Sequence, residues 1–290
     1  APPSLKVSMA YEDGFTASGS LIIGGADAKE KAAKFAEIFW MRLKTDFEKY
    51  KSELVGYDSC NKHLNLSYQP HEILLRMSVY DHDHSKIELF SKTLASLILS
   101  GPPGAAVTGG RPRIQKVLSY WPTLIDREYT ASEVSLIGED LQRLGLEIIP
   151  DKPVSLNPAD SRAKLTINST GSRNWESSED EVDVPLRKLC LARSGDKGDA
   201  SNVGVIARSP EIYSYIKQYM TADFIKYVFA PVCKGRVLRY EMDNLLGLNF
   251  ILEHSLDGGG TKTLMIDAQG KLFASNLLDF TVKVPRKLMK

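Results

Sequence analysis

One stretch of changed composition divides this 290-residue chain, and that division constrains the fold more than any other feature. Prolines punctuate residues 151–158, and residues 169–182 are rich in Ser, Glu and Asp, with an acidic run at 177–181. Such a composition buries too little apolar surface to offset the entropy lost on folding. We therefore predict a solvated linker over 151–183 between a first domain, 1–150, and a second domain, 184–290, at about 100–200 residues per domain.

Charge and cysteine content exclude several classes of function. The chain has 37 Lys and Arg against 36 Asp and Glu, a net charge of +1. Proteins that bind nucleic acid or anionic membranes show a basic excess, and no segment approaches the ~20 apolar residues of a membrane span. The three cysteines are odd in number and far apart, which indicates a reducing compartment. We expect no nucleic-acid or membrane partner, and a cytoplasmic location with the mitochondrial matrix as the alternative.

The first 150 residues alternate between strand patterns and helix patterns. Two alternating segments flank Glu12–Gly14 and predict a hairpin that turns there. Asp27 is a plausible cap for a helix with apolar residues at helical spacing, and Gly101–Gly104 ends a second helix. This interleaved order predicts an α/β-like first part within an α+β fold class. The expected strands are 5–11, 18–23, 53–57, 72–80 and 114–121, and the expected helices are 27–50 and 85–99.

The second part predicts a compact α+β sandwich of one sheet and two helices. Pro210 opens one helix at its first turn, and Thr221 caps the next. Asp267–Gly270 is typical of a hairpin turn that joins the last two strands. The expected strands are 184–192, 201–208, 238–242, 247–254, 261–266 and 271–284.

The polar segment from Ser194 to Asn202 is the sharpest candidate for chemistry. Lys197 lies between the carboxylates of Asp196 and Asp199, and a partly desolvated cluster of this kind shifts pKa values toward acid–base work. The same carboxylates, with the Ser194 and Asn202 oxygens, could instead hold a hard cation. The third interpretation is a hydrogen-bonded β-turn with surface ion pairs, and the sequence leaves all three open.

Two glycine-rich segments are further candidates for binding. Gly258, Gly259 and Gly260 favour a flexible hairpin connection between two strands, with close approach of the backbone to a ligand as the alternative. Arg111 and Arg113 end a glycine-rich loop that could bind an acyl-CoA phosphate or a substrate carboxylate. That loop follows a helix and lacks the Gly-Lys-Ser/Thr ending of a P-loop, so nucleotide binding is not indicated.

The histidines suggest little chemistry by themselves. The run from Asp81 to His84 reads as a helix cap with surface charge, because consecutive residues on a turn cannot all face one metal ion. His254 is the only histidine of the second part and reads as structural. We expect no metal site and no cofactor, with a CoA thioester as a conceivable substrate.

Residues 191–208, Leu-Ala-Arg-Ser-Gly-Asp-Lys-Gly-Asp-Ala-Ser-Asn-Val-Gly-Val-Ile-Ala-Arg, resemble the C-terminal domain of the acyclic terpene utilisation A (AtuA) family. Tyr240-Glu241, Leu248–Phe250 and Gly258–Thr261 fit the same domain in order. The first part resembles the end of the family's larger N-terminal domain, at Pro3–Val7, Lys31–Leu43, Ser100–Gly104, Gly110–Arg113 and Tyr120–Pro122. Family members are longer at the N-terminus, so we expect residues 1–150 to be an incomplete domain whose remainder is a separate fragment or was removed.

The resemblance implies a ferredoxin-like fold for the second domain and a setting in the catabolism of acyclic terpenes and branched acids. We therefore predict an enzyme, or part of one, that acts on a branched-chain or terpenoid acyl-CoA or carboxylic acid by lyase- or hydratase-type acid–base chemistry. Lys197, Asp196 and Asp199 would be catalytic, and Ser194, Asn202 and the Gly258–Gly260 backbone would bind an oxyanion or a carboxylate. The alternative is a non-catalytic oligomerisation or docking module of an acyl-CoA-metabolising complex. In either case we expect a homo-oligomer.

Overall fold

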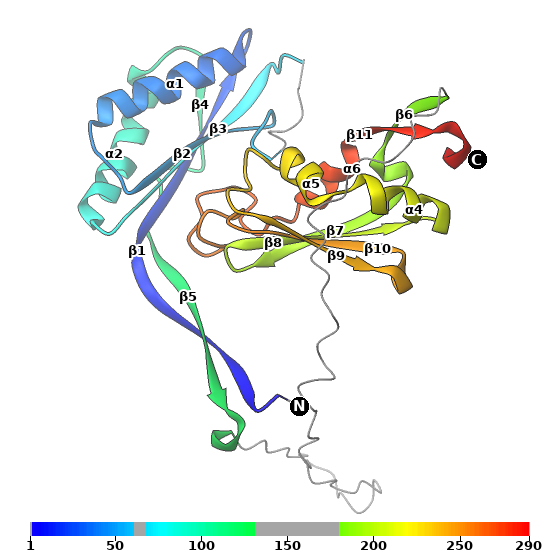
Figure 1. Cartoon of the computed structure of the whole chain (residues 1–290). Helices are drawn as coiled ribbons and strands as arrows, with labels where there is room; N and C mark the ends of the chain where they lie inside the picture. The colour runs from blue at the N-terminus through cyan, green and yellow to red at the C-terminus, as the bar shows by residue number, and fades with distance from the viewer. Residues whose placement is uncertain (1, 61–67, 131–179, 290) are drawn as a thin grey trace, which may run out of the picture. The chain divides into compact units, whose positions relative to one another are not determined.

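The computed structural model describes residues 2–60, 68–130 and 180–289, which form a mixed α+β fold (Figure 1). The α+β fold class expected from the sequence is therefore confirmed. The described residues divide into two compact units, one of residues 12–119 with the C-terminal part and one that includes residues 2–11 and 120–130. The predicted linker lies outside the described residues except for its end at 180–183, and the predicted domain boundaries stay a prediction.

The first part of the larger unit is an antiparallel sheet in the order β2-β3-β1-β4, with β5 also paired to β1. One pairing joins β1 to β3, from Phe15 opposite Asp81 to Gly24 opposite Glu72. The strands are β1 (Ser4–Gly24), β2 (Lys49–Val55), β3 (Glu72–Asp81), β4 (Ala105–Thr108) and β5 (Gln115–Asp126).

Helices α1 (Ala28–Leu43) and α2 (His84–Ser100) cover one face of this sheet (Figure 1). Their apolar residues recur at helical spacing, so one side of each helix is buried against the strands. Phe39 of α1 meets Phe90 of α2 edge-on, with 5.5 Å between ring centroids. The Asp83 carboxylate accepts the Ser85 N–H at 2.8 Å and caps α2, which confirms that the acidic turn begins a helix.

Two predictions for this part are wrong. No hairpin turns at Glu12–Gly14, because β1 runs without interruption through it. Gly14 has φ +80°, and a Cβ there would lie 2.9 Å from the Asp81 carbonyl oxygen, so the glycine allows close packing within the strand rather than a turn. Helix α1 ends at Leu43 instead of near Tyr50, because Lys44 adopts a left-handed conformation with φ 48°.

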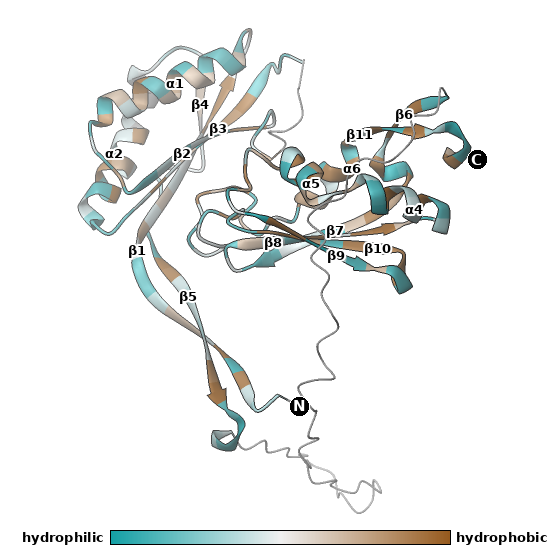
Figure 2. Cartoon of the chain, viewed as in Figure 1, coloured by the Kyte–Doolittle hydropathy of each residue, from teal (hydrophilic) through white to brown (hydrophobic). Residues whose placement is uncertain are grey.

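The second part of the larger unit is an antiparallel sheet in the order β7-β8-β10-β9, with helices α4, α5 and α6 packed on one face (Figure 1). Strands β6 and β11 pair separately. The buried apolar residues of both sheets come from the strands and from the helices packed on them, and Figure 2 shows apolar segments on both kinds of element. The elements are β6 (Glu181–Pro185), β7 (Cys190–Lys197), β8 (Ala200–Ala207), α4 (Pro210–Tyr219), α5 (Ala222–Val228), β9 (Val237–Met242), β10 (Gly247–Leu252), α6 (Phe273–Asp279) and β11 (Thr281–Pro285).

The end of the chain differs from the prediction. Residues 261–266 form no strand, and the predicted hairpin at Asp267–Gly270 is replaced by helix α6 followed by β11. The Asp267 carboxylate accepts the N–H groups of Lys271 and Leu272 at 2.9 and 3.0 Å, which fixes the turn immediately before α6 in place of a hairpin. The predicted strand 184–192 is also two strands, β6 and β7, separated by a short 3₁₀ turn.

None of the helices in the described part of the chain is both long enough and apolar enough to cross a lipid bilayer.

Candidate active site

The segment from Ser194 to Asn202 is a tight β-hairpin. Strand β7 pairs with β8 in antiparallel register up to Lys197 opposite Ala200, so only Gly198 and Asp199 remain for the turn. Gly198 has φ +67°, a conformation that glycine adopts without a steric penalty. The hairpin therefore presents Lys197 and Asp199 at the end of the sheet, where the sequence predicts the site.

Asp199 organises the loop that follows β10. Its carboxylate contacts Nδ1 of His254 at 2.7 Å and accepts the Gly258 N–H at 2.6 Å. Its carbonyl oxygen accepts the N–H groups of Ser255 and Leu256, both at 3.0 Å. The structure thus brings together Asp199 and Gly258, two of the predicted site residues, and adds a histidine that the sequence reasoning had set aside.

His254 has the geometry of a general base oriented by a carboxylate. A proton on Nδ1 that donates to Asp199 leaves the lone pair on Nε2, and Nε2 has no hydrogen-bond partner within the described residues. The imidazole is 71% exposed, so a substrate can reach it. His254 also has φ 49°, an unusual backbone conformation for a residue with a Cβ, and such strain tends to cluster at functional sites.

A signal for His254 is present in the sequence. It lies two residues beyond the end of β10, and Leu252 of β10 pairs with Ser201 at the start of β8. Antiparallel neighbours place the end of one strand beside the start of the next. A correct pairing of the two predicted strands would therefore have put His254 beside Asp199.

The remaining predicted polar residues of the hairpin are separated from one another. Lys197 is exposed, and Asp196 pairs with Lys271 at 3.8 Å. The Ser194 hydroxyl donates to the Gly270 carbonyl at 2.7 Å and accepts the Ala274 N–H at 2.9 Å, which ties β7 to the start of α6. In this structure Ser194 is thus engaged in holding the fold.

The other predicted binding residues are distributed more widely. The Asn202 amide donates to Asn249 at 3.4 Å on the face of the sheet. The Gly258 N–H donates to the Asp199 carboxylate of the hairpin, and the Gly259 N–H donates to the Leu256 carbonyl oxygen of its own loop. A Cβ on Gly259 would lie 3.2 Å from the Gly198 carbonyl oxygen. The loop therefore needs its glycines for close packing against the hairpin, and Gly260 follows at its end.

Arg111 and Arg113 are not joined to the hairpin by any contact among the described residues. Arg111 donates to the Ser91 hydroxyl at 2.9 Å and lies 3.8 Å from the Glu88 carboxylate, both on α2. Arg113 is exposed. Their predicted role in binding a carboxylate or phosphate stays a prediction.

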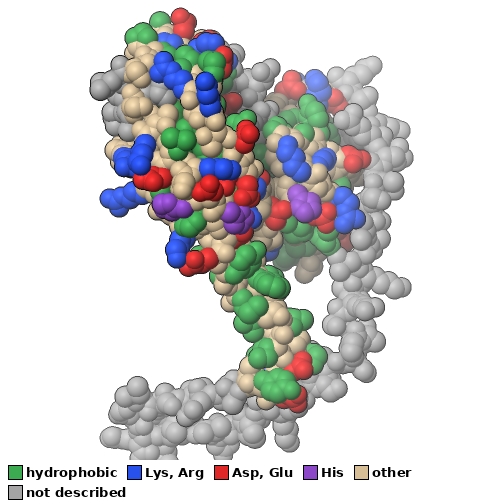
Figure 3. Space-filling view, turned by 90° about the vertical axis from the view of Figure 1, so that its left-hand side faces the viewer, with side chains coloured by type: hydrophobic (Ala, Val, Ile, Leu, Met, Phe, Trp, Pro, Cys, Tyr) green, Lys and Arg blue, Asp and Glu red, His purple; other side chains and the backbone are tan. Residues whose placement is uncertain are grey.

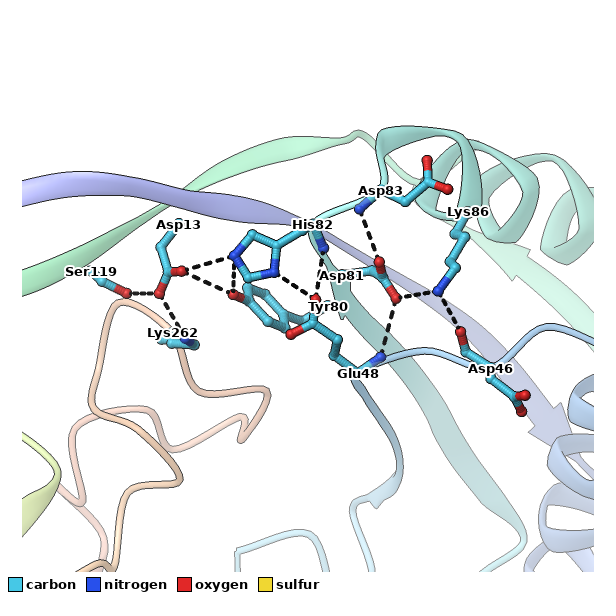
Figure 4. Close-up of polar contacts among 10 residues, drawn as sticks. All are labelled: Asp13, Asp46, Glu48, Tyr80, Asp81, His82, Asp83, Lys86, Ser119 and Lys262. Atoms are coloured by element: carbon cyan, nitrogen blue, oxygen red, sulfur yellow. Dashed lines mark hydrogen bonds and ion pairs between the residues drawn. The ribbon is translucent and has the colours of Figure 1, made fainter.

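A second polar cluster surrounds Asp13 (Figure 4). The Asp13 carboxylate is buried and takes hydrogen bonds from Tyr80 at 3.2 Å, from Ser119, and from the Lys262 ammonium at 2.6 Å. The His82 Nε2 lies 3.1 Å from the same carboxylate. Lys262 and Ser119 hold the pKa of Asp13 far below its ordinary value, so this carboxylate is ionised at neutral pH.

His82 lies between two carboxylates (Figure 4). Its Nδ1 is 2.5 Å from Glu48, and its Nε2 faces Asp13. Glu48 and then Asp13 raise the pKa of His82, which favours the imidazolium with both ring N–H groups donating. Because both nitrogens are engaged, His82 stabilises the cluster electrostatically and, unlike His254, offers no lone pair to a substrate.

The Asp13 cluster joins the two sheets of the larger unit. Lys262 comes from the loop before α6, whereas Asp13, Tyr80 and Ser119 come from β1, β3 and β5. The same loop donates the Ile266 N–H to buried Glu53 at 3.1 Å. Tyr80 also forms a small apolar core with Val117 and Leu264.

An open hollow of about 260 Å³ lies between the edge of the first sheet and this loop. Lys49 crosses its rim and donates to the Asp257 carbonyl oxygen at 3.0 Å. Asp257 follows His254 by three residues, so the hollow borders the loop that carries the histidine. The residues that line it are Phe47, Glu48, Lys49, Tyr50, Lys51, Asp257 and Leu264.

Within the described residues, no group of three or more His, Cys, Asp and Glu side chains is arranged to hold a metal ion. His63, a conceivable additional ligand for the run Asp81–His84, lies outside those residues.

Comparison with known protein families gives two matches in chain order. Residues 1–136 match the acyclic terpene utilisation family protein AtuA, and residues 184–283 match the AtuA ferredoxin-like domain. No curated protein and no solved structure gives a significant match. The second match contains the hairpin, His254 and the glycine loop. The two matches agree with the resemblance seen in the sequence, and the chain belongs to the acyclic terpene utilisation AtuA family.

Proposed function

We propose that the chain is an enzyme, or part of one, that moves a proton on a branched-chain or terpenoid acyl-CoA or a related carboxylic acid. The observation that carries the proposal is the 2.7 Å contact between Asp199 and His254 at the tip of the hairpin. A carboxylate-oriented imidazole with an exposed second nitrogen is suited to remove a proton from carbon next to a carbonyl, or from water. Both steps belong to lyase- and hydratase-type reactions.

The roles of the predicted residues change in this proposal. His254 accepts the proton at Nε2, and Asp199 orients the ring and stabilises the imidazolium that forms. Lys197, which is exposed beside the turn, contributes positive charge toward a developing enolate or carboxylate oxygen. Asp196 has a positioning role, because it pairs with Lys271 at the neighbouring loop.

The setting that we propose follows from the substrate class. CoA thioesters are intracellular metabolites, and the three cysteines Cys60, Cys190 and Cys233 are free thiols, which fits a reducing compartment. We therefore propose a cytoplasmic or mitochondrial-matrix location and a small acyl thioester as the partner, without a cofactor.

The test measures proton exchange, because exchange reports acid–base chemistry before the overall reaction is known. The protein is incubated in D₂O with isovaleryl-CoA or 3-methylbut-2-enoyl-CoA, and deuterium incorporation is followed by mass spectrometry. His254→Gln should lower the exchange rate at least about 100-fold, and Asp199→Asn should lower it by about 10-fold or more through loss of the oriented tautomer. His71→Gln is the matched control, since His71 is also exposed and lies outside the site. Full exchange by His254→Gln, or none by the native protein, would refute the proposal.

The sheet of the second part supports one alternative, a docking module for an acyl-CoA-metabolising complex. Leu191 and Ile206 face each other across β7 and β8, and they are 56% and 45% exposed on the face opposite the helices. Exposed apolar neighbours of this kind mark contact surfaces. If docking is the function, Leu191→Asp changes the size of the complex, whereas His254→Gln changes nothing.

A further inference from the structure

The smaller unit contains a two-stranded ribbon, here called the arm, made of residues 4–11 and 120–129. Strands β1 and β5 pair along it. The rings of Tyr11 and Trp121 meet edge-on at 6.1 Å, and the Lys6 ammonium lies 5.4 Å from the centre of the Tyr120 ring. At the end of the arm, the Arg127 N–H donates a hydrogen bond to the Pro3 carbonyl oxygen at 2.9 Å.

The arm exposes both of its faces. In β5, Val117 and Ser119 are buried and Leu118 is exposed, which is the alternation expected of a strand on a core. From Tyr120 to Asp126 no residue of β5 is buried, and none of β1 is buried from Ser4 to Glu12. The arm thus has no core of its own among the described residues.

The exposed side chains of the arm are large and apolar (Figure 3). At about 200 Å² for a large side chain, exposed fractions between 41% and 73% leave on average roughly 110 Å² each, or about 700 Å² over the two faces of the arm. A standard protein interface buries about 800 Å² on each partner, so a dimer of standard size has to bury both faces of the arm. These residues are Met9, Tyr11, Tyr120, Trp121, Leu124 and Tyr129.

The backbone of the arm is also incompletely paired. β1 meets β3 only from Phe15 onward and β4 only from Ser20, so within the described residues its outer edge is open along the arm. β5 pairs only with β1 in the same part of the structure. An isolated two-stranded ribbon is marginally stable in water, and open edges favour pairing with another chain.

The charges of the arm favour a second copy of the same chain over a charged partner. Lys6 and Arg127 balance Asp126 and Glu128, so the arm is neutral. A neutral surface attracts neither a polyanion nor a polycation, and two such surfaces do not repel each other. A two-fold axis would place the same apolar patch on both sides of the contact.

We propose that the arms of two copies wrap around each other in a two-fold symmetric dimer, with Trp121 on one face of the arm and Leu124 on the other at the centre of the interface. This inference is independent of the acid–base function, because it uses no residue of the hairpin or of the His254 loop.

The test is the mass of the full chain in solution, measured by sedimentation at protein concentrations up to about 100 µM, well above a Kd of about 1 µM. The native protein should be a dimer. The double variant Trp121→Glu with Leu124→Glu should raise the dimer Kd at least about 30-fold, as for loss of a central aromatic anchor. Met41→Glu is the control, because Met41 is similarly exposed (60%) on α1 and should leave the dimer intact.

A second measurement keeps the proposal testable if the double variant misfolds. A spin label on Thr123→Cys in the arm should give one short inter-copy distance in pulsed electron paramagnetic resonance, whereas a label on Met41→Cys should not. A monomeric native protein, a dimer that survives the arm substitutions, or distant arm labels within a dimer would each overturn the inference.

Discussion

Replacing Lys262 by Met should measure how strongly the Asp13 cluster fastens the two sheets together. The ammonium lies 2.6 Å from the Asp13 carboxylate, and at an effective dielectric constant of about 20 two unit charges at that distance attract by about 6 kcal/mol. Desolvation cancels much of this attraction, and removing one partner of a fully buried pair costs about 3–5 kcal/mol. Lys262 is 27% exposed, and Asp13 keeps Ser119, Tyr80 and His82. We therefore expect about 2 kcal/mol.

The assay is urea unfolding of the native protein, of Lys262→Met, of Asp13→Asn and of the double variant, which isolates the coupling between the two side chains. The pKa of Asp13 is held below its ordinary value of 3.8, so the ion pair contributes fully above about pH 4. Its contribution is lost as the pH falls from there toward the lowered pKa of the folded state. The coupling should therefore be constant between pH 7 and pH 4 and decline at lower pH.

Lys116→Met is the matched control. Lys116 pairs with Glu12 at 2.8 Å, but both side chains are well exposed, so its loss should change the free energy of unfolding by less than about 1 kcal/mol. A coupling energy between Asp13 and Lys262 below about 0.5 kcal/mol would refute the reasoning, because this ion pair would then stabilise the fold no more than an exposed ion pair does.

Two further outcomes follow from the fold. Gly19→Ala should destabilise the protein by about 1–3 kcal/mol in thermal or urea unfolding, because the added Cβ would lie 2.2 Å from Leu94 Cδ2. Gly204→Ala is the control: the atom nearest to its added Cβ is 3.7 Å away, so the substitution should have little effect on stability. The His82→Gln variant should have a smaller free energy of unfolding than the native protein below about pH 6.5. This difference in stability should vanish as the pH rises through the raised pKa of His82. A difference that grows with pH would contradict the assignment of His82 as an imidazolium.

The secondary structure of the first part was predictable where local pattern decides it. Helix α2 and strand β3 lie where the spacing of apolar residues puts them, and Asp83 caps the helix as expected. The turn predicted at Glu12–Gly14 is absent from the structure. A polar segment that ends in glycine also fits within a strand when its carboxylate, here that of Asp13, is buried. The partner of that carboxylate, Lys262, is 249 residues away in the sequence.

In the candidate site, too, local pattern predicted the segment but not the contacts of its side chains. Residues 194–202 stood out because glycine and charge lie between two strand patterns. The structure extends both strands into this segment and leaves only Gly198 and Asp199 for the turn. The function of Asp199 did not follow from its neighbour Lys197, since its carboxylate is directed to His254 and Gly258 on another loop. The position of His254 just beyond β10 points to Asp199 only once the pairing of β10 with β8 is known.

The sequence alone thus determined the α+β class, the family and those elements that local pattern decides, because periodicity, capping and turn chemistry are local properties of the chain. Only the tertiary structure decided which polar groups meet. Burial of Asp13 and orientation of His254 both depend on segments that approach through sheet pairing and loop packing. The free energy of such contacts arises from desolvation and distance, which no stretch of sequence contains by itself.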